Sequence, residues 1–333
     1  MPRLRRVDCR SPGITRRRCG RGFSHLERGK RISDPAKLAR IQALSIPPAW
    51  TGVWICCDER GHLQAVGIDA AGRKQYLYHP RWRERRDQEK FDHMLTFARS
   101  LPVLRAVTAE QINGDGLTRE RVLACAVRLL DEGLFRIGGE EYADENGGYG
   151  LATMEQRHVS VENGAVVFDY AGKGGKQLVQ SFTDPQVQEI VKALKRRRAG
   201  GPSLLAYKHS RWAVVHSADI NAHIKEIAGD EFSAKDFRTW HATVVAAIAL
   251  GESPPATSKA GRERAIIHAA EQAAERLGNT PAVCRASYID PRVIDRFRTD
   301  VTIARTLARI GRSDRSKPAT RQKIEQAVVA LLD

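Results

Sequence analysis

Tyrosine, arginine and lysine are the residue types in this sequence that could break a phosphodiester bond without a metal ion or a nucleotide. The sequence has no Asp, Glu and His cluster typical of a metal-dependent nuclease, and no Gly-x-x-x-x-Gly-Lys-Ser/Thr loop. Cleavage then needs a nucleophile, cations around the non-bridging oxygens, and a proton donor for the leaving oxygen. Tyrosine can attack if positive charge favours its phenolate, because its free pKa is roughly 10. Arginine suits the cation role through its planar fork and permanent charge, and lysine suits the donor role because its pKa is tunable.

The charge of the chain makes nucleic acid the expected partner. Its 333 residues include 55 Lys and Arg against 39 Asp and Glu, a net charge of +16, which attracts polyanions and makes binding salt-dependent. Ten Lys and Arg and two acidic residues fall within residues 1–30, where no periodicity is visible, so we expect a disordered basic tail there. The six cysteines form no Cys-x-x-Cys pair, which predicts reduced thiols rather than a disulfide framework or a zinc site.

A small β-rich domain is expected over residues 31–85. Residues 31–45 predict a short helix that ends before Pro47-Pro48. After it come three short strand candidates separated by Gly-containing turns, at residues 53–57, 62–68 and 74–78.

From residue 86 to residue 333 the period becomes helical, which predicts a larger, mainly helical catalytic domain. A three-stranded sheet interrupts it, because strands over 158–162 and 165–170 flank Asn163-Gly164, a strong hairpin signal, and a third strand follows over 177–182. Further helices are expected over residues 91–101, 118–132, 185–198, 218–228, 234–251 and 260–277. The expected fold class is therefore α+β.

Helix ends are marked clearly in the last part of this domain. Ser233 is a candidate N-cap with Asp236 three residues later, and Gly278 is a candidate C′ residue of the helix before it. Thr280 followed by Pro281 predicts the start of another helix, which would carry Tyr288.

Four short motifs hold the arginine, lysine and tyrosine residues of interest. They are Leu134-Phe135-Arg136-Ile137-Gly138, followed by Glu141-Tyr142 and residues 146–151; Tyr170-Ala171-Gly172-Lys173 after a hairpin; residues 233–240 around Arg238; and Leu277-Gly278-Asn279-Thr280-Pro281, with Ser287-Tyr288 beyond. In order and spacing these motifs resemble those of type IB DNA topoisomerases, in the poxvirus-like branch found in bacteria. The resemblance covers residues 30–300, and although any one motif is weak, four in order are specific.

The resemblance implies a role for each of five catalytic residues. Tyr288 would attack the phosphorus and become linked to the 3′ phosphate, while Arg136 and Arg238 would hold the non-bridging oxygens. Lys173 would protonate the leaving 5′ oxygen, and Asn279 would donate to a phosphate oxygen. The cut strand would swivel and be resealed, so that supercoiled duplex DNA is relaxed without ATP or metal and with no cofactor.

The same resemblance implies DNA contacts from the N-terminal domain and from the first arginine motif. Gln75, Tyr76 and Tyr78 would meet the duplex from one strand, and Tyr142 from the catalytic domain. The two lobes would close around duplex DNA as a clamp, and the enzyme would act as a monomer. Without the resemblance, Tyr76 and Tyr78 share one strand face and would more often be core residues.

Several alternatives stay open at this point. Arg136 could instead close an ion pair with Glu140 or Glu141, and Lys176 on the same turn competes with Lys173 for the donor role. Many relatives carry His where Asn279 stands, and asparagine keeps a donor but cannot carry charge.

Two other functions compete with relaxation. A tyrosine recombinase uses the same chemistry, but usually has His three residues before the second arginine, where Lys235 stands here. A non-enzymatic basic DNA-binding protein would bind with a steep salt dependence and never form a covalent complex. The sequence contains no run of about 18 apolar residues, so no membrane span is expected. The N-terminus lacks a signal-peptide pattern. We therefore expect a cytoplasmic, nucleoid-associated protein with no membrane partner.

Overall fold

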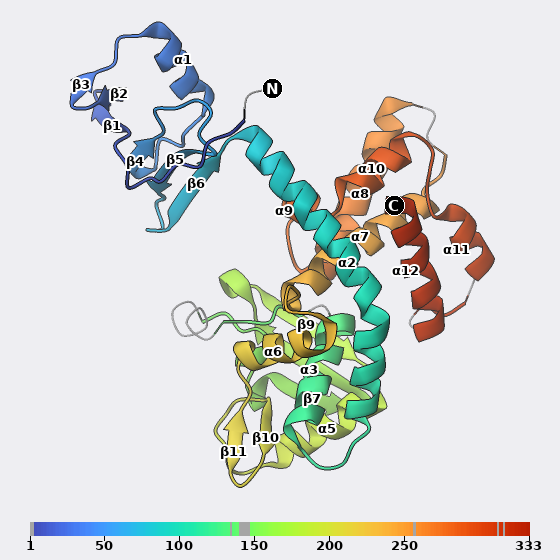
Figure 1. The fold of residues 1–333 in the computed structure, drawn as a ribbon. Helices are drawn as coiled ribbons and strands as arrows, with labels where there is room; N and C mark the ends of the chain where they lie inside the picture. The colour runs from blue at the N-terminus through green and yellow to red at the C-terminus, as the bar shows by residue number, and fades with distance from the viewer. Residues whose placement is uncertain (1–2, 134, 140–146, 256–257, 312, 316) are drawn as a thin grey trace. The chain divides into compact units, whose positions relative to one another are not determined.

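A six-stranded antiparallel sheet forms the N-terminal part of the computed structural model, which describes residues 3–133, 135–139, 147–255, 258–311, 313–315 and 317–333. The strand order is β3-β2-β1-β4-β5-β6, with helix α1 between β3 and β4 in the chain (Figure 1). These elements are β1 (Ile14–Cys19), β2 (Gly22–Glu27), β3 (Lys30–Arg31), α1 (Pro35–Ala43), β4 (Thr51–Ile55), β5 (Leu63–Ile68) and β6 (Lys74–Tyr78). The three strands expected between residues 53 and 78 are thus confirmed.

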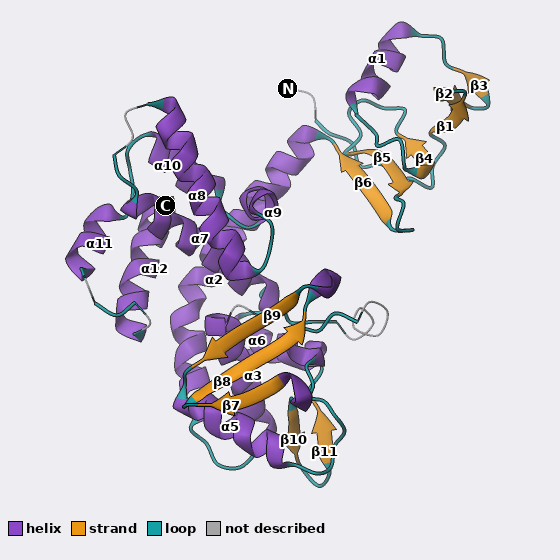
Figure 2. Cartoon of the chain, turned by 180° about the vertical axis from the view of Figure 1, so that it is seen from behind, coloured by secondary structure: helices purple, strands orange, loops and turns teal. Residues whose placement is uncertain are grey.

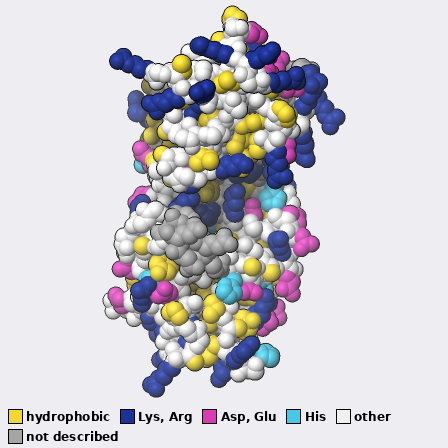
Figure 3. Space-filling view, turned by 90° about the vertical axis from the view of Figure 1, so that its left-hand side faces the viewer, with side chains coloured by type: hydrophobic (Ala, Val, Ile, Leu, Met, Phe, Trp, Pro, Cys, Tyr) yellow, Lys and Arg dark blue, Asp and Glu magenta, His cyan; other side chains and the backbone are white. Residues whose placement is uncertain are grey.

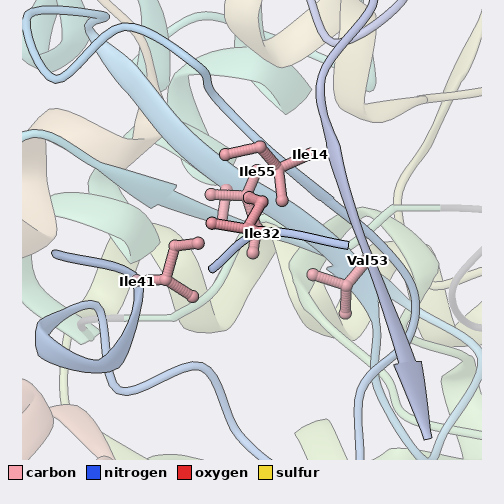
Figure 4. Close-up of a cluster of buried hydrophobic side chains, with 6 residues drawn as sticks. Ile14, Ile32, Ile41, Val53 and Ile55 are labelled. Atoms are coloured by element: carbon pink, nitrogen blue, oxygen red, sulfur yellow. The ribbon is translucent and has the colours of Figure 1, made fainter. Parts of the chain in front are cut away.

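Residues 14–31 belong to this sheet, so the expected disordered tail over residues 1–30 is wrong for that segment. Ile14 is fully buried and shares a hydrophobic cluster with Ile32, Ile41, Val53 and Ile55. Figure 4 shows these side chains, which come from the two strands β1 and β4, the segment after β3, and α1. Burial of such apolar surface offsets the entropy lost by ordering the basic segment.

The arginine content of β1 does not prevent it from pairing, because one of its arginines satisfies backbone groups. Arg16 donates to the carbonyl oxygens of Pro47 at 3.1 Å and Trp50 at 2.6 Å. The Arg16 guanidinium also lies over the Phe23 ring, 4.1 Å from its centroid, in a cation–π contact. Arg16, which the composition would place in a solvated tail, instead contacts β2 and the loop before β4.

The chain divides into two compact units, Met1–Asp92 and His93–Asp333, and the division falls inside one long helix, α2 (Pro80–Ile112). The predicted boundary lay at residue 85, at the start of that helix. None of the helices in the described ranges combines the length and apolar character needed to cross a membrane.

The second unit is mainly helical and contains a three-stranded antiparallel sheet, β7-β8-β9 (Figure 2). The turn between β7 and β8 has positive φ angles of 48° at Asn163 and 82° at Gly164, as expected of an Asn-Gly hairpin turn. The elements before α6 are α3 (Arg119–Gly133), β7 (Val159–Glu162), β8 (Ala165–Ala171), β9 (Gln177–Phe182), α5 (Pro185–Arg196), β10 (Ala206–Lys208) and β11 (Trp212–Val214). The elements that follow are α6 (Ser217–Ala228), α7 (Ala234–Glu252), α8 (Lys259–Leu277), α9 (Pro281–Ser287), α10 (Pro291–Arg298), α11 (Ala304–Ile310) and α12 (Pro318–Leu332).

A buried ionic network attaches α12 to the centre of the second unit. Arg321 and Glu325 of α12 meet Asp131 of α3 and Arg105 of α2, with 2.6 Å between Arg321 Nη2 and Asp131 Oδ1 and 2.8 Å between Arg105 Nε and Asp131 Oδ2. Burial acts to raise the pKa of Asp131, but Arg321, His241 and Arg105 hold that pKa well below its usual value. The carboxylate is therefore charged and fully dependent on its partners, because an unpaired buried charge is strongly destabilising.

Candidate active site

Two glycines allow the segment that carries Arg136 to cross another segment at close range. The backbone N–H of Leu151 donates to the carbonyl oxygen of Arg136 at 2.8 Å. Gly138 has φ of 82°, and a Cβ on it would lie 2.9 Å from the Cα of Gly150. A Cβ on Gly150 would lie 2.5 Å from the Cα of Gly138, so neither position has room for a larger residue. The first arginine motif is thus held in place by backbone contact.

Aromatic packing fixes the other side of the same motif. Phe135 is buried, and its ring meets Phe168 edge-on with 4.8 Å between centroids and Tyr170 with 6.2 Å between centroids. Both partners lie on β8, the strand that leads into the lysine turn. The residue before Arg136 is therefore anchored on the three-stranded sheet.

The second arginine lies in the second turn of α7. Ser233 is the N-cap of this helix, and both its backbone N–H, at 2.8 Å, and its hydroxyl, at 3.0 Å, donate to Asp236 Oδ2. Arg238 is almost completely buried, and its Nη2 donates to the carbonyl oxygen of Leu277 at 2.8 Å. Its guanidinium carbon lies 5.6 Å from the centre of the Tyr288 ring.

Both arginines converge on the C-terminal end of α8. Arg136 donates to the carbonyl oxygen of Gly278 at 3.3 Å and to Oδ1 of Asn279. Gly278 directly follows Leu277, whose carbonyl oxygen accepts a hydrogen bond from Arg238. Gly278 ends the helix in the left-handed region with φ of 63°, as predicted. The last carbonyls of a helix lack intrahelical partners and carry partial negative charge, so they attract guanidinium groups.

Tyr288 follows α9 directly rather than lying within it. Thr280 caps α9 through its side chain, Pro281 is the first helical residue, and the N–H of Tyr288 donates to the carbonyl oxygen of Cys284 at 2.9 Å. The predicted start of the helix is confirmed, and its end places Tyr288 at the C-cap.

Sequence reasoning missed Thr243, which fixes the backbone on both sides of Ile289. Thr243 is fully buried on α7, and its Oγ1 lies 3.2 Å from the carbonyl oxygen of Tyr288. Thr243 Oγ1 also accepts the N–H of Asp290 at 3.1 Å. In the sequence it stands in an apolar stretch, where nothing distinguishes it from a core residue.

The two arginines also act on a second tyrosine. Burial raises the pKa of Tyr170 to about 12, although Arg238 and Arg136 oppose that rise. The Tyr170 hydroxyl donates a hydrogen bond to Oε1 of Gln180 at 3.2 Å. The hydroxyl therefore stays protonated, with Gln180 as its hydrogen-bond acceptor. Burial lowers the pKa of Arg238 and Arg136 lowers it further, while Tyr288 opposes both effects.

Lys173 lies on an exposed turn between β8 and β9, together with Lys176. Leu178 connects this turn with the end of α8. A Cβ on Gly172 would lie 2.6 Å from Leu178 Cδ1, and one on Gly278 would lie 3.6 Å from Leu178 Cδ2. The structure thus brings Arg136, Arg238, Asn279 and Tyr288 together and carries the lysine turn to the same helix end.

The predicted DNA-contacting residues of the first unit lie on two faces of β6. Tyr76 and Tyr78 are 43% and 40% exposed and stack with 6.1 Å between ring centroids, so they are not core residues. Gln75 points to the other face and donates to Asp69 at 2.9 Å. Tyr142 lies outside the described residues, as do Glu140 and Glu141.

Comparison with known families identifies the group of proteins to which this arrangement belongs. The family model of the catalytic core of eukaryotic DNA topoisomerase I matches residues 79–310, and that of the N-terminal domain of bacterial DNA topoisomerase IB matches residues 22–69. The chain belongs to the type IB DNA topoisomerases. The second match begins inside the segment that we expected to be a tail.

Individual topoisomerases agree with this assignment. The chain is 31% identical to DNA topoisomerase 1B of Acanthamoeba polyphaga mimivirus over 261 residues, which cover 76% of this chain and 77% of that protein. It is 22% identical to DNA topoisomerase 1 of Rabbit fibroma virus over 251 residues, 73% and 74% of the two chains. It is also 26% identical to DNA topoisomerase 1 beta of Arabidopsis thaliana over 168 residues, which are half of this chain and 17% of that protein. The predicted family is confirmed, while the roles of single residues stay predictions.

Asn279 offers a sharp test of one such role in this topoisomerase. Its Oδ1 is engaged by Arg136, whereas its buried Nδ2 has no hydrogen-bond partner among the described residues. A buried unsatisfied donor is costly unless a ligand uses it. We expect Asn279→Ala to slow single-turnover strand cleavage by roughly 10²-fold, the scale for losing one transition-state donor. Thermal unfolding of the same variant serves as the control for folding. Cleavage within a factor of about two of the unmodified enzyme would remove Asn279 from the site.

Proposed function

We propose that this topoisomerase relaxes supercoiled duplex DNA by cutting one strand through Tyr288 and then resealing it. The observation that carries the proposal is the convergence of Arg136 and Arg238 on the end of α8, with Arg238 against the Tyr288 ring. The hydrogen bonds described above use neutral oxygens as acceptors. A guanidinium keeps its positive charge when it donates to a neutral oxygen, and that charge attracts a phosphate.

The proposed reaction exchanges one phosphodiester for another. The Tyr288 oxygen forms a bond to phosphorus as the bond between phosphorus and the 5′ oxygen breaks. Tyr288 gives up its proton to water, and the leaving 5′ oxygen receives one from Lys173, which becomes neutral, so that charge and atoms balance. Arg136 and Arg238 hold the non-bridging oxygens, where negative charge grows in the transition state.

Resealing is the reverse of the same step. The 5′ hydroxyl attacks the 3′ phosphotyrosyl bond, Lys173 takes the proton back, and Tyr288 leaves. The energy of the original bond is kept in the phosphotyrosyl link, so we propose that neither a nucleotide nor a metal ion takes part. We also propose that the protein works as a monomer, with no membrane partner, on DNA in the nucleoid of the cytoplasm. Closure of the two lobes as a clamp stays a prediction.

The test is relaxation of negatively supercoiled plasmid in EDTA, without ATP. Relaxation together with a protein–DNA adduct trapped by denaturant is the expected result, and peptide mapping should place the DNA on Tyr288. Tight binding with neither relaxation nor adduct would contradict the proposal and favour a non-enzymatic DNA-binding protein. Recombination of paired defined sites, without relaxation of an arbitrary plasmid, would favour a tyrosine recombinase.

A further inference from the structure

The ionic network around α12 lies in the interior of the second unit, where charged side chains are unusual. Many Lys and Arg side chains lie at the surface on the face of the molecule that Figure 3 shows. In the network, by contrast, the side chains of Asp131 and Glu325 are only 5% and 9% exposed. A buried ion pair often adds little net stability, and its best-attested use is to fix one arrangement of the elements that it joins.

Arg321 of α12 holds the end of α3, the helix that leads to Arg136. Its Nη2 donates to Oδ1 of Asp131 at 2.6 Å and to the main-chain carbonyl oxygen of Asp131 at 3.0 Å. Because α3 ends at Gly133, this carbonyl is among the last four of the helix, which lack intrahelical partners. Arg321 therefore restrains the backbone where the chain leaves α3 toward Arg136.

An open cleft of about 1060 Å³ borders the same end of α3. Its lining includes Glu132 and Gly133, and Ile324 of α12. Phe135 anchors the following segment on the three-stranded sheet. On the cleft side the end of α3 is not enclosed by packed side chains, so the hydrogen bonds from Arg321 restrain it there.

The same network reaches α7 directly behind Arg238. Trp240 is fully buried, and its Nε1 donates to Oε1 of Glu325 at 3.4 Å. His241 follows it in the chain, and its Nε2 lies 3.3 Å from Oδ1 of Asp131. The network therefore joins the end of α3 to the turn of α7 that carries the second arginine.

We propose that Arg321 is a positioning residue for strand cleavage, which holds the segment of Arg136 at a fixed place relative to Arg238. The inference rests on the proposed cleavage through Tyr288. Arg321 acts through the end of α3 and not on the phosphate. Both guanidinium groups must meet the non-bridging oxygens at once, and a misplacement of about 1 Å can cost roughly 10²-fold in rate.

Two variants separate positioning from folding. Arg321→Met leaves the buried Asp131 carboxylate with one cation fewer, so the melting temperature should fall. Asp131→Asn combined with Arg321→Met removes one charge of each sign and leaves the pair between Arg105 and Glu325 in place, so much of that loss should be recovered. Single-turnover cleavage of a defined duplex is measured for both variants, and Kd for the same duplex is measured in a Tyr288→Phe background.

We expect both variants to cleave roughly 10²-fold more slowly than the unmodified enzyme, although the double variant is the more stable of the two. Their Kd values should stay within a factor of about two of the parent, because the interaction that is lost acts only in the transition state. If Arg321→Met fails to fold, the double variant carries the test alone.

Arg121→Met is the matched control for a buried arginine of the same helix. Arg121 lies near the start of α3 and donates to the carbonyl oxygens of Ile112 at 3.0 Å and Gly116 at 2.8 Å, and to Glu189 at 2.8 Å. Its loss should lower the melting temperature and leave the rate of cleavage unchanged.

The route through Arg136 is tested in an Arg136→Gln background. There the combined Asp131→Asn and Arg321→Met changes should slow the residual cleavage by less than about twofold, because no guanidinium group remains for Arg321 to position. A further slowing of roughly 10²-fold in this background would overturn the proposal.

Two other results would overturn it. One is cleavage by the double variant within a factor of about two of the unmodified enzyme, which would leave the network with a role in stability alone. The other is a loss of duplex affinity as large as the loss in cleavage rate, which would place the network in binding. Failure of the proposed function is a separate result, because the unmodified protein would then form no covalent adduct with DNA.

Discussion

Replacing Tyr288 by phenylalanine is expected to abolish both plasmid relaxation and the covalent adduct. The change removes one oxygen and keeps the ring that packs 5.6 Å from the Arg238 guanidinium carbon. Loss of a nucleophile costs on the order of 10⁶-fold in rate in enzymes that use one. The measurement is denaturant-trapped DNA–protein complex on supercoiled plasmid in EDTA, beside filter binding to show that the duplex is still bound.

Tyr149→Phe is the matched control for this experiment. The Tyr149 hydroxyl receives a hydrogen bond from Arg157 at 3.0 Å and lies 3.4 Å from Glu155, while its ring packs on His158 with 4.2 Å between centroids. It is occupied by neighbours, so we expect the adduct to form normally in this variant. An adduct that survives in Tyr288→Phe would keep the class of enzyme and move the nucleophile, with Tyr142 and Tyr149 tested next.

Replacing Lys173 by alanine should slow cleavage by roughly 10²- to 10⁴-fold, the usual contribution of a general acid. The 5′ oxygen is a poor leaving group as an alkoxide, so the step depends on the proton. Lys176→Ala is the natural comparison, because Lys176 is exposed on the same turn and the replacement removes the same charge. Single-turnover cleavage of a defined duplex should be slowed far more by the first change than by the second.

A substrate with a sulfur atom in place of the 5′ oxygen separates proton donation from other roles of Lys173. A thiolate needs no proton to leave, because the pKa of a thiol is roughly 8.5. We expect Lys173→Ala to cleave this substrate at close to the rate of the unmodified enzyme. If the sulfur substrate restores the cleavage rate of Lys176→Ala instead, the proton donor is Lys176 and not Lys173. If Lys173→Ala cleaves both substrates slowly, Lys173 acts on the phosphate and not on the leaving group.

Local signals predicted the parts of the fold that depend on neighbours in the chain. The Asn163-Gly164 turn, the Gly278 helix end and the Thr280-Pro281 helix start are each decided by the backbone preferences of one or two residues. Their structures therefore follow from sequence without knowledge of the tertiary fold.

The basic N-terminal segment could not be predicted in the same way. Strand β1 buries only Ile14 fully, and its three consecutive arginines hide the alternation that marks a half-buried strand. Its place is decided in part by partners far along the chain, which are β4 and the loop carbonyls that accept from Arg16. Tertiary contacts outweigh local propensity in such a segment.

The candidate site was predictable as a set of residues but not as an arrangement. Four motifs pointed to Arg136, Lys173, Arg238 and Tyr288, yet nothing in them indicates that both arginines would meet the carbonyl end of α8. That meeting depends on residues far apart in the chain, such as Arg238 and Leu277. The role of Thr243 could not be predicted for a related reason. The function of a buried hydroxyl depends on the backbone groups to which it is hydrogen-bonded, and these are known only from the structure.

The order of these parts along the chain has a consequence for biosynthesis. Translation delivers Arg136, Lys173 and Arg238 first, and the end of α8, Asn279 and Tyr288 only afterwards. The Arg321 and Glu325 side chains that complete the ionic network at Asp131 come later still. Under the proposed mechanism, a growing polypeptide therefore carries the cations that attract DNA before it carries Tyr288, the proposed nucleophile.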